Sequence, residues 1–216
     1  MPAVLRNRGV TPYEDARALQ GELARERADD RRLDTLLLIE HPPVYTFGRR
    51  TDMSHRPDAD DVPLIASDRG GSITYHGPGQ LIGYPIFRVA QFCSGPRVFV
   101  RRLETALIGA LADFGIPGQR ATSRPGIWVD RSRKIASIGL RVMHGVAIHG
   151  FALNVNVDLS PFERIVPCGL SDCRMTSMAA LLGAPLPMAH VREAVGRHIA
   201  AEFNLHWRED EGPCCQ

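Results

Sequence analysis

The chain has 216 residues and a formal net charge of +2 at pH 7, and its share of 44% hydrophobic and 23% charged residues is typical of a soluble globular protein. The length suits one domain over residues 1–216, and without an apolar run that could span a bilayer or an evident signal peptide, we expect a cytoplasmic protein with no membrane contact. The arginines are scattered and not interleaved with aromatic residues, which argues against nucleic-acid binding.

The spacing of apolar residues predicts strands with helices around them. Several predicted strands are only a few residues apart, which favours antiparallel pairing. The expected fold class is therefore α+β (mixed α/β), with a mostly antiparallel sheet flanked by helices. In chain order, the expected elements are a helix over residues 13–27, strands over 34–40 and 44–49, a surface loop over 51–66, strands over 73–75 and 81–87 around a turn, a helix over 96–114, strands over 126–129, 135–142 and 146–155, and helices over 175–182 and 191–203.

The five cysteines indicate neither a disulfide framework nor a metal site. Their number is odd, and no pair of Cys or His residues has the spacing of a zinc site, so no metal ion is expected. The sequence gives no role to four of them, Cys93, Cys173, Cys214 and Cys215.

Lys134 is the only lysine of the chain, whereas 25 positions carry arginine. Arginine keeps its proton at any working pH, but a lysine side chain can give one up. Two interpretations are open. Lys134 is an accident of composition in an exposed turn, or position 134 needs a group that transfers protons.

The densest glycine region covers residues 69–81 and contains the turn His76-Gly77-Pro78-Gly79. Glycine lets backbone amides approach a ligand closely. The segment matches neither the dinucleotide-binding fingerprint nor the P-loop, so phosphate binding is not indicated. A plain hairpin around this turn explains the pattern equally well, and His76 by itself is more often an ordinary hydrogen-bonded histidine than a catalyst.

Cys168 stands between Pro167 and Gly169, in a sequence typical of a turn where a thiol is accessible. A cysteine beside glycine is more often a small buried hydrophobe. A nucleophilic role needs a nearby cation or base, because an unperturbed thiol is mostly protonated at neutral pH. Residues 149–154 (His-Gly-Phe-Ala-Leu-Asn) fit a strand beside a ligand, and equally a structural strand.

Four segments in combination carry a resemblance to a known family. They are residues 69–81, with the Arg-Gly-Gly and His-Gly-Pro-Gly-Gln-Leu motifs, residues 134–139 (Lys-Ile-Ala-Ser-Ile-Gly), residues 149–154 and residues 167–169 (Pro-Cys-Gly). In this order they resemble the octanoyl-[acyl-carrier-protein]–protein octanoyltransferases of lipoate biosynthesis, over about residues 34–182. Glu40-His41-Pro42 and Tyr45-Thr46 fit the same pattern. The resemblance implies a fold like the catalytic domains of biotin and lipoate protein ligases.

The resemblance also implies the site residues. Cys168 corresponds to the family's nucleophile, and Lys134 to the lysine that lowers the pKa of that thiol. The implied substrate-binding residues are Arg69, Gly70, Gly71, Ser72, Ile73, Thr74, Tyr75, His76, Ser137, Ile138, Gly139, Gly150, Phe151 and Ala152.

The reaction implied by the resemblance has two steps. Cys168 attacks the octanoyl thioester of acyl carrier protein, and a lysine of a lipoyl domain then attacks the acyl-enzyme to form an amide. The acceptor would be a lipoyl domain of a 2-oxoacid dehydrogenase or the glycine cleavage H protein. No cofactor is expected, since the thioester is already activated.

Three alternatives stay open at this point. An ATP-dependent lipoate or biotin protein ligase of the same fold would use a lysine but no cysteine nucleophile. A cysteine hydrolase would pair Cys168 with His76 or His149 and release free octanoate. A non-enzymatic acyl-binding module would bind reversibly without a covalent adduct.

Overall fold

The computed structural model describes residues 1–49, 51, 52, 54, 56, 57, 61–122, 124–165 and 173–208. Strands and helices are mixed along the chain. The helices and 3-10 turns are α1 (Tyr13–Ala28), η2 (Val89–Gln91), α2 (Pro96–Ala112), η3 (Ser160–Arg164), α3 (Met178–Leu182) and α4 (Met188–Phe203). The strands are β1 (Pro2–Val10), β2 (Asp34–Glu40), β3 (Val44–Phe47), β4 (Leu64–Ala66), β5 (Thr74–His76), β6 (Gln80–Ile86), β7 (Gln119–Ala121), β8 (Arg124–Trp128), β9 (Arg133–Met143), β10 (Val146–Asn154), β11 (Arg174–Met175) and β12 (His206–Arg208).

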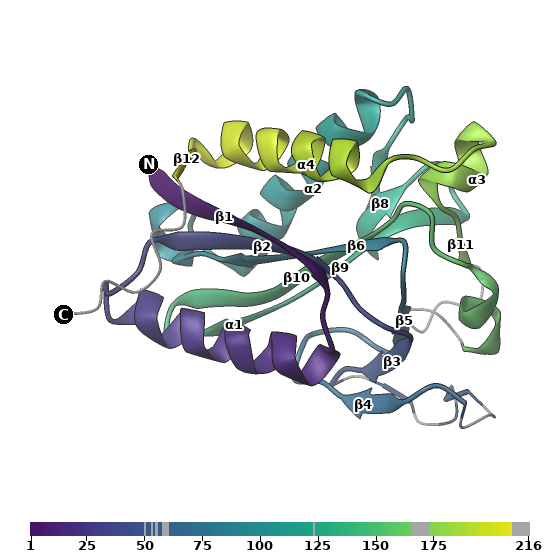
Figure 1. The fold of residues 1–216 in the computed structure, drawn as a ribbon, viewed down its shortest axis with the longest axis horizontal. Coiled ribbons are helices and arrows are strands. Elements are labelled where there is room, and N and C mark those ends of the chain that lie inside the picture. Colours follow the sequence, from purple (N-terminus) through teal and green to yellow (C-terminus); the bar gives the residue numbers. More distant parts are fainter. Residues whose placement is uncertain are drawn as a thin grey trace.

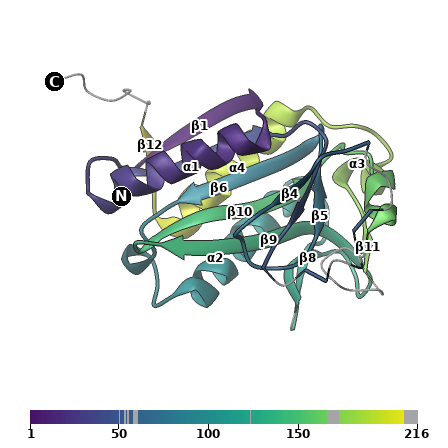
Figure 2. The same ribbon diagram turned by 90° about the horizontal axis from the view of Figure 1, so that it is seen from below.

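A large sheet forms the middle of the molecule, in the order β12-β1-β2-β6-β10-β9-β8-β7, with β11 beside β9 (Figures 1 and 2). The pairs from β2 to β7 are antiparallel, whereas β1 is parallel to both β2 and β12. The predicted fold class, a mixed α/β fold with a mostly antiparallel sheet flanked by helices, is confirmed.

Helices cover both faces of this sheet, with α1 on one side and α2 and α4 on the other (Figure 1). Strand β2 has apolar residues on both faces, because successive side chains of a strand point to opposite faces of the sheet. Leu36 and Leu38 pack in the cluster of α2 and α4, while Leu37 and Ile39 pack in the cluster of α1. A strand that is buried on both faces therefore has a continuous run of apolar residues in its sequence, not an alternation of apolar and polar residues.

The helix spacing of the sequence predicted the helices well. The expected helix over 13–27 is α1, that over 96–114 is α2, and that over 191–203 is the larger part of α4. The expected helix over 175–182 begins later, at Met178, because Met175 pairs with Lys134 as part of β11. Ser177 caps α3 by accepting a 3.1 Å hydrogen bond from the amide of Ala180.

The hairpin interpretation of residues 69–81 is wrong. Strands form on both sides of the Gly-Pro-Gly turn as expected, but they belong to different sheets: β5 pairs with β3 in a small sheet ordered β4-β3-β5, and β6 pairs with β2 and β10. Gly79, at φ +82, lets the chain turn where its amide donates to Glu40 and its carbonyl accepts from Asn156. The turn therefore links two sheets.

Strands β9 and β10 form the predicted antiparallel pair, joined by the two-residue turn His144-Gly145. Both turn residues have positive φ, +49 and +79, as tight hairpin turns require. The pairing extends as far as Leu153 opposite Ala136. At Arg133 and Lys134, β11 pairs with β9 in place of β10. Lys134 therefore lies between Trp128 of β8 and Met175 of β11.

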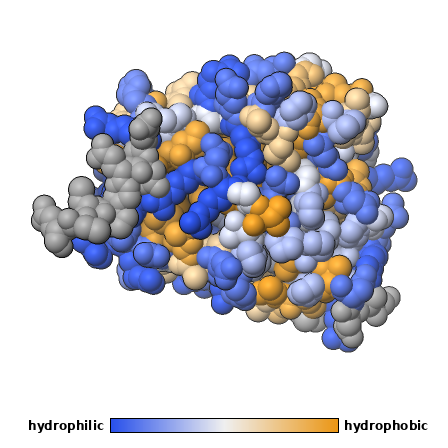
Figure 3. Space-filling model, in the orientation of Figure 1, coloured by the Kyte–Doolittle hydropathy of each residue, from blue (hydrophilic) through white to orange (hydrophobic). Residues whose placement is uncertain are grey.

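On the face seen in Figure 1, hydrophilic residues predominate, and apolar ones gather in several separate patches (Figure 3). Within the described ranges, no helix is both long and apolar enough to cross a membrane.

Candidate active site

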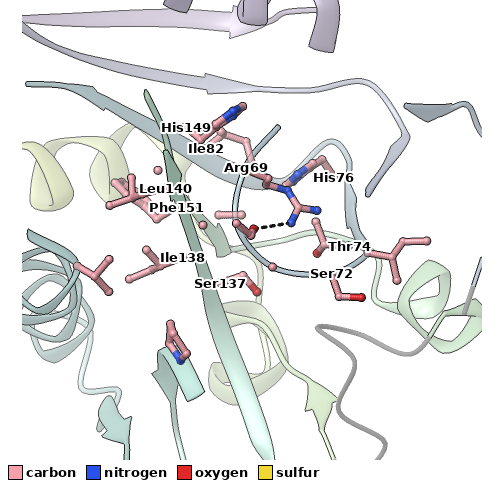
Figure 4. A pocket seen from close by; sticks show the side chains of 18 of the residues that line it. Arg69, Ser72, Thr74, His76, Ile82, Ser137, Ile138, Leu140, His149 and Phe151 are labelled. Carbon is pink, nitrogen blue, oxygen red and sulfur yellow. Dashed lines mark hydrogen bonds between the residues drawn. The ribbon is translucent and has the colours of Figure 1, made fainter. Parts of the chain in front are cut away.

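A cavity of about 630 Å³ lies against β9 and β10. Its lining includes residues 137–140 of β9, residues 149–152 of β10 and residues 69–74. Ile82, Ile138, Leu140 and Phe151 make much of the lining apolar (Figure 4). The cavity therefore suits an apolar ligand with a few polar contacts.

Lys134 lines the cavity although it is 3% exposed, which excludes the interpretation of this residue as part of an exposed turn. Its Nζ lies 5.4 Å from the centre of the Trp128 ring, a position that favours a cation. Its side chain passes over Gly126, where a Cβ would stand 2.6 Å from Lys134 Cε. Gly126 has φ +116 and donates its amide to the buried carboxylate of Glu104 at 3.1 Å. These contacts fix the path of the lysine side chain.

The backbone at Lys134 is tied to the centre of the sheet by a chain of buried hydrogen bonds. Thr176 donates its amide to the carbonyl of Lys134 at 2.9 Å, and Asn154 Nδ2 donates to the carbonyl of Thr176 at 2.9 Å. Asn154 Oδ1 in turn accepts from Gln80 Nε2 at 2.8 Å. Gln80 Oε1 contacts His76 Nδ1 at 2.7 Å. The strand that carries the lysine is thus connected to the histidine of the glycine-rich segment.

His76 is buried and uncharged in this network. Nδ1 donates to Gln80, which leaves Nε2 to accept from the hydroxyl of Thr46 at 3.4 Å. Burial of the ring and, to a smaller extent, the electrostatic effect of the neighbouring His41 lower the pKa of His76 to about 3. Both ring nitrogens therefore contact side chains of the fold, and the ring lines the cavity.

A second buried histidine, His41, lies behind His76, with their ring centroids 5.8 Å apart. Its Nδ1 donates to the carbonyl of Thr11 at 2.6 Å, and its Nε2 accepts from the hydroxyl of Tyr84 at 2.7 Å. Burial lowers the pKa of His41 and raises that of Tyr84 well above its usual value. Tyr13 stacks over His76 at 6.4 Å. Together these rings form a polar aromatic wall that stays uncharged at neutral pH.

Arg69 lines the cavity and connects the glycine-rich segment to Thr46 of β3. Its Nη2 donates to the carbonyl and the hydroxyl of Thr46 at 2.8 and 3.0 Å, and its Nη1 donates to the carbonyl of Gly70 (Figure 4). The amide of Gly70 donates to the carbonyl of Leu140 on β9 at 3.3 Å. A Cβ on Gly139 would lie 3.0 Å from the carbonyl of Gly70. Glycine here permits the close approach of the two segments.

Of the substrate-binding residues inferred from the resemblance, all but Tyr75 line this cavity. Tyr75 packs instead between Tyr45 and Phe162, with ring centroids at 5.3 and 5.5 Å, so the structure places it outside the lining. Ser72 is 8% exposed, and its hydroxyl has no hydrogen-bond partner among the described residues. Contact of these residues with a substrate stays a prediction.

Cys168, the predicted nucleophile, lies in residues 166–172, outside the described residues. Of the other cysteines, Cys93 and Cys173 are described, and neither forms a disulfide with another described residue. Among the residues that the structure describes, no group of three His, Cys, Asp or Glu side chains could hold a metal ion.

Some residues of the lining were not singled out from the sequence. They come from elements distant along the chain and are Tyr13, Asp52, Ile82, Tyr84, Pro96, Arg97, Val100, Arg124, Pro125 and Leu140. Tyr13 begins a helix and Ile82 and Tyr84 lie in a buried strand, so their patterns indicate only core packing. No local signal distinguishes a core residue from one that faces a cavity.

Comparison with known proteins agrees with this architecture. Residues 12–200 match the family model described as the lipoyl protein ligase A/B catalytic domain. An octanoyltransferase from Acidothermus cellulolyticus is 50% identical over 201 residues, which covers 91% of this chain and 90% of that protein. The resemblance seen in the sequence motifs is confirmed: the chain belongs to the lipoyl protein ligase A/B catalytic domain family, in which the octanoyltransferases are its relatives.

Two solved structures show the same fold at low sequence identity. A bipartite lipoate protein ligase from Thermoplasma acidophilum superposes with a TM-score of 0.74 at 16% identity, covering 97% of this chain and 87% of that one. A biotin protein ligase from Aquifex aeolicus gives a TM-score of 0.54 at 14% identity, covering 94% and 69%. The expected likeness to biotin and lipoate protein ligases is therefore found.

Proposed function

We propose that this enzyme transfers an octanoyl group from octanoyl-acyl carrier protein to a specific lysine of lipoyl domains, through a thioester on Cys168. The proposal is supported by two relatives named octanoyltransferase, which are 50% and 46% identical over most of the chain. The structural neighbour from Thermoplasma acidophilum is described with its E2 lipoyl domain, which supports a lipoyl domain as the acceptor. The acceptors are lipoyl domains of 2-oxoacid dehydrogenases or the glycine cleavage H protein.

The observation that carries the mechanism is the burial of the chain's only lysine in the wall of a largely apolar cavity. As an ammonium, Lys134 stabilises the thiolate of Cys168. The thiolate attacks the octanoyl thioester, a new thioester forms on Cys168, and the thiol of the carrier protein leaves with a proton. Lys134 supplies that proton and becomes an amine.

In the second step, the lysine of the lipoyl domain attacks the thioester on Cys168. An amide bond forms, the thiolate of Cys168 leaves, and the proton of the attacking amine passes to Lys134, which restores the starting state. The reaction needs no ATP, because the bond energy of the donor thioester is retained in the acyl-enzyme.

The test is intact-mass spectrometry of the purified protein after exposure to octanoyl-acyl carrier protein, followed by peptide mapping. We expect one octanoyl adduct on Cys168, absent in Cys168→Ser and retained in the matched variant Cys93→Ser. Addition of a lipoyl domain should discharge the adduct without ATP. An adduct confined to another cysteine, with Cys168→Ser fully active, would remove the nucleophile assignment. Dependence on ATP would favour a ligase, and release of free octanoate without an acceptor would favour a hydrolase.

A further inference from the structure

His149 occupies an unusual position in β10. Its φ is +58, in the left-handed region that side chains other than glycine rarely adopt inside a strand. The pairing of β10 with β6 ends at Phe151, opposite Gly83. Nearby Pro85 has no N–H to donate. Backbone hydrogen bonding resumes at Ala147, whose amide donates to the carbonyl of Phe87. In the interruption, the amide of His149 donates to Gln20 Oε1 of α1 at 2.7 Å.

The His149 side chain stands at one end of the cavity. In the pairing of β9 and β10, His149 lies opposite Leu140. Leu140 is six positions along β9 from Lys134, which corresponds to roughly 20 Å of strand. Figure 4 shows His149 and Ile82 on the side of the cavity opposite Ser137 and Ser72. Along β9, the lining of the cavity runs from Lys134 to Leu140, so His149 lies at the opposite end of this stretch from Lys134.

A second cavity, of about 550 Å³, lies beyond His149, between α1 and residues 66–68. Its lining includes Gly21 of α1, Met143 and Ile148, and the side chains of Arg17, Arg25 and Arg49. Among the described residues, His149 is the only one that lines both cavities. The ring is 4% exposed and is held by Asp68, whose Oδ1 accepts from Nε2 at 2.6 Å. Asp68 is itself paired with Arg141.

From these positions we infer that His149, anchored by Asp68, is the partition that closes the acyl cavity at its far end and limits the length of the acyl chain. The inference rests on the proposed octanoyl transfer and adds a specificity-determining residue to it. Removing the imidazole ring joins the two cavities. The extra methylene groups of a longer chain then enter the second cavity, where Met143, Ile148 and the aliphatic stems of the arginines provide apolar contact.

The test compares transfer from acyl carrier protein loaded with 8-, 10-, 12- and 14-carbon acyl groups. In His149→Gly, a residue suited to φ +58, the ratio of kcat/KM for the 12-carbon over the 8-carbon donor should rise about tenfold or more, since each buried methylene is worth roughly fourfold. His149→Asn, which also tolerates positive φ, should shift the ratio in the same direction. Asp68→Ala removes only the anchor and should give a smaller shift. His144→Gly, at the other positive-φ histidine of this hairpin, is the matched control and should leave the profile unchanged.

A double variant tests the route of the longer chain. Gly21 lies on α1 in the second cavity, and the nearest atom to an added Cβ is Arg25 Nη1 at 3.7 Å. Gly21→Leu, added to His149→Gly, should fill this space and cancel the gain for 12-carbon donors. An unchanged chain-length profile in both folded His149 variants would overturn the inference while octanoyl transfer stands. Failure of the unaltered protein to transfer octanoate to any lipoyl domain would instead contradict the proposed function.

Discussion

The side-chain amide of Gln80 donates a 2.8 Å hydrogen bond to the amide oxygen of Asn154, and both residues are 1% exposed. Asn154 is the last residue of β10, at the point where β11 replaces β10 beside β9. By donating to the carbonyl of Thr176, it connects the two strands that lie on the same side of β9. A buried amide with both ends bonded specifies one arrangement of the chain around it.

Replacement of Asn154 by alanine should leave Gln80 Nε2 and the carbonyl of Thr176 with fewer partners. We expect the free energy of unfolding to fall by about 2–5 kcal/mol, and turnover to fall as well, since Thr176 holds the backbone of Lys134. The matched control is Asn156→Ala, which loses two hydrogen bonds to Leu186 away from the cavity. Urea unfolding and steady-state transfer separate the two effects. If both variants lost stability and turnover in the same proportion, Asn154 would have no specific link to Lys134.

Gly126 is expected to be indispensable for the position of Lys134. In Gly126→Ala, the new Cβ would stand 2.6 Å from Lys134 Cε and closer still to the carbonyl oxygen of Ala136 on β9, and φ +116 would be strained as well. Transfer should fall at least tenfold, with a parallel loss of thiol reactivity at Cys168. Gly145→Ala has positive φ, +79, but no atom within 4 Å of the new Cβ, and therefore shows the effect of strain alone. Equal activity of the two variants would contradict the prediction. Alkylation rates and transfer rates are the measurements.

Lys134→Arg tests whether Lys134 must exchange a proton. The guanidinium is a permanent cation, so it can stabilise a thiolate but cannot relay a proton, and turnover should fall by roughly 10²-fold or more. The larger planar group also has little room between Gly126 and the Trp128 ring. Thiol alkylation against pH should be measured beside transfer. Near-normal alkylation with poor transfer identifies loss of the proton relay, whereas near-normal transfer would show that Lys134 supplies charge only.

Buried histidines should make the fold sensitive to acid. The pKa of His76 is lowered to about 3 by burial, and that of His149 to about 4 by burial and by Arg69. Unfolded histidines titrate near 6.5, so between this pH and the folded pKa the unfolded state binds more protons. The resulting stability is fully present above about pH 6.5 and is lost as pH falls toward 4 and then 3.

The expected slope is about 1.4 kcal/mol per pH unit for each histidine that is neutral only in the folded state. Urea unfolding at several pH values between 4 and 7 measures it. His76→Gln should reduce the slope by the contribution of about one proton, that is by about 1.4 kcal/mol per pH unit. The same change at exposed His144 should leave the slope unchanged. A slope unaffected by His76→Gln would mean that this ring is protonated in the folded protein as well.

Local patterns predicted the helices and most strands, because their signals lie within one turn or a few residues. The apolar spacing of residues 99–111 predicts α2. Pro96 indicates where this helix begins, and Gly115 lies just beyond its end. Strand β1 was missed, since Pro2–Val10 contains the polar run Arg6-Asn7-Arg8, in which Asn7 and Arg8 are exposed. It forms because Ala3 and Val4 pack inward while the backbone pairs with β2 and β12, partners that local sequence does not indicate.

The sequence by itself determined the residue types on which the proposed chemistry rests. Lys134 as the only lysine, the Pro-Cys-Gly motif at Cys168 and the glycines of residues 69–79 are matters of residue type and order, which a chain carries without folding. Only the tertiary structure decided that β5 and β6 belong to different sheets, and that His149 stands between two cavities. Periodicity reports that a residue is buried, but the partner that buries it is fixed by the packing of segments far apart in the chain.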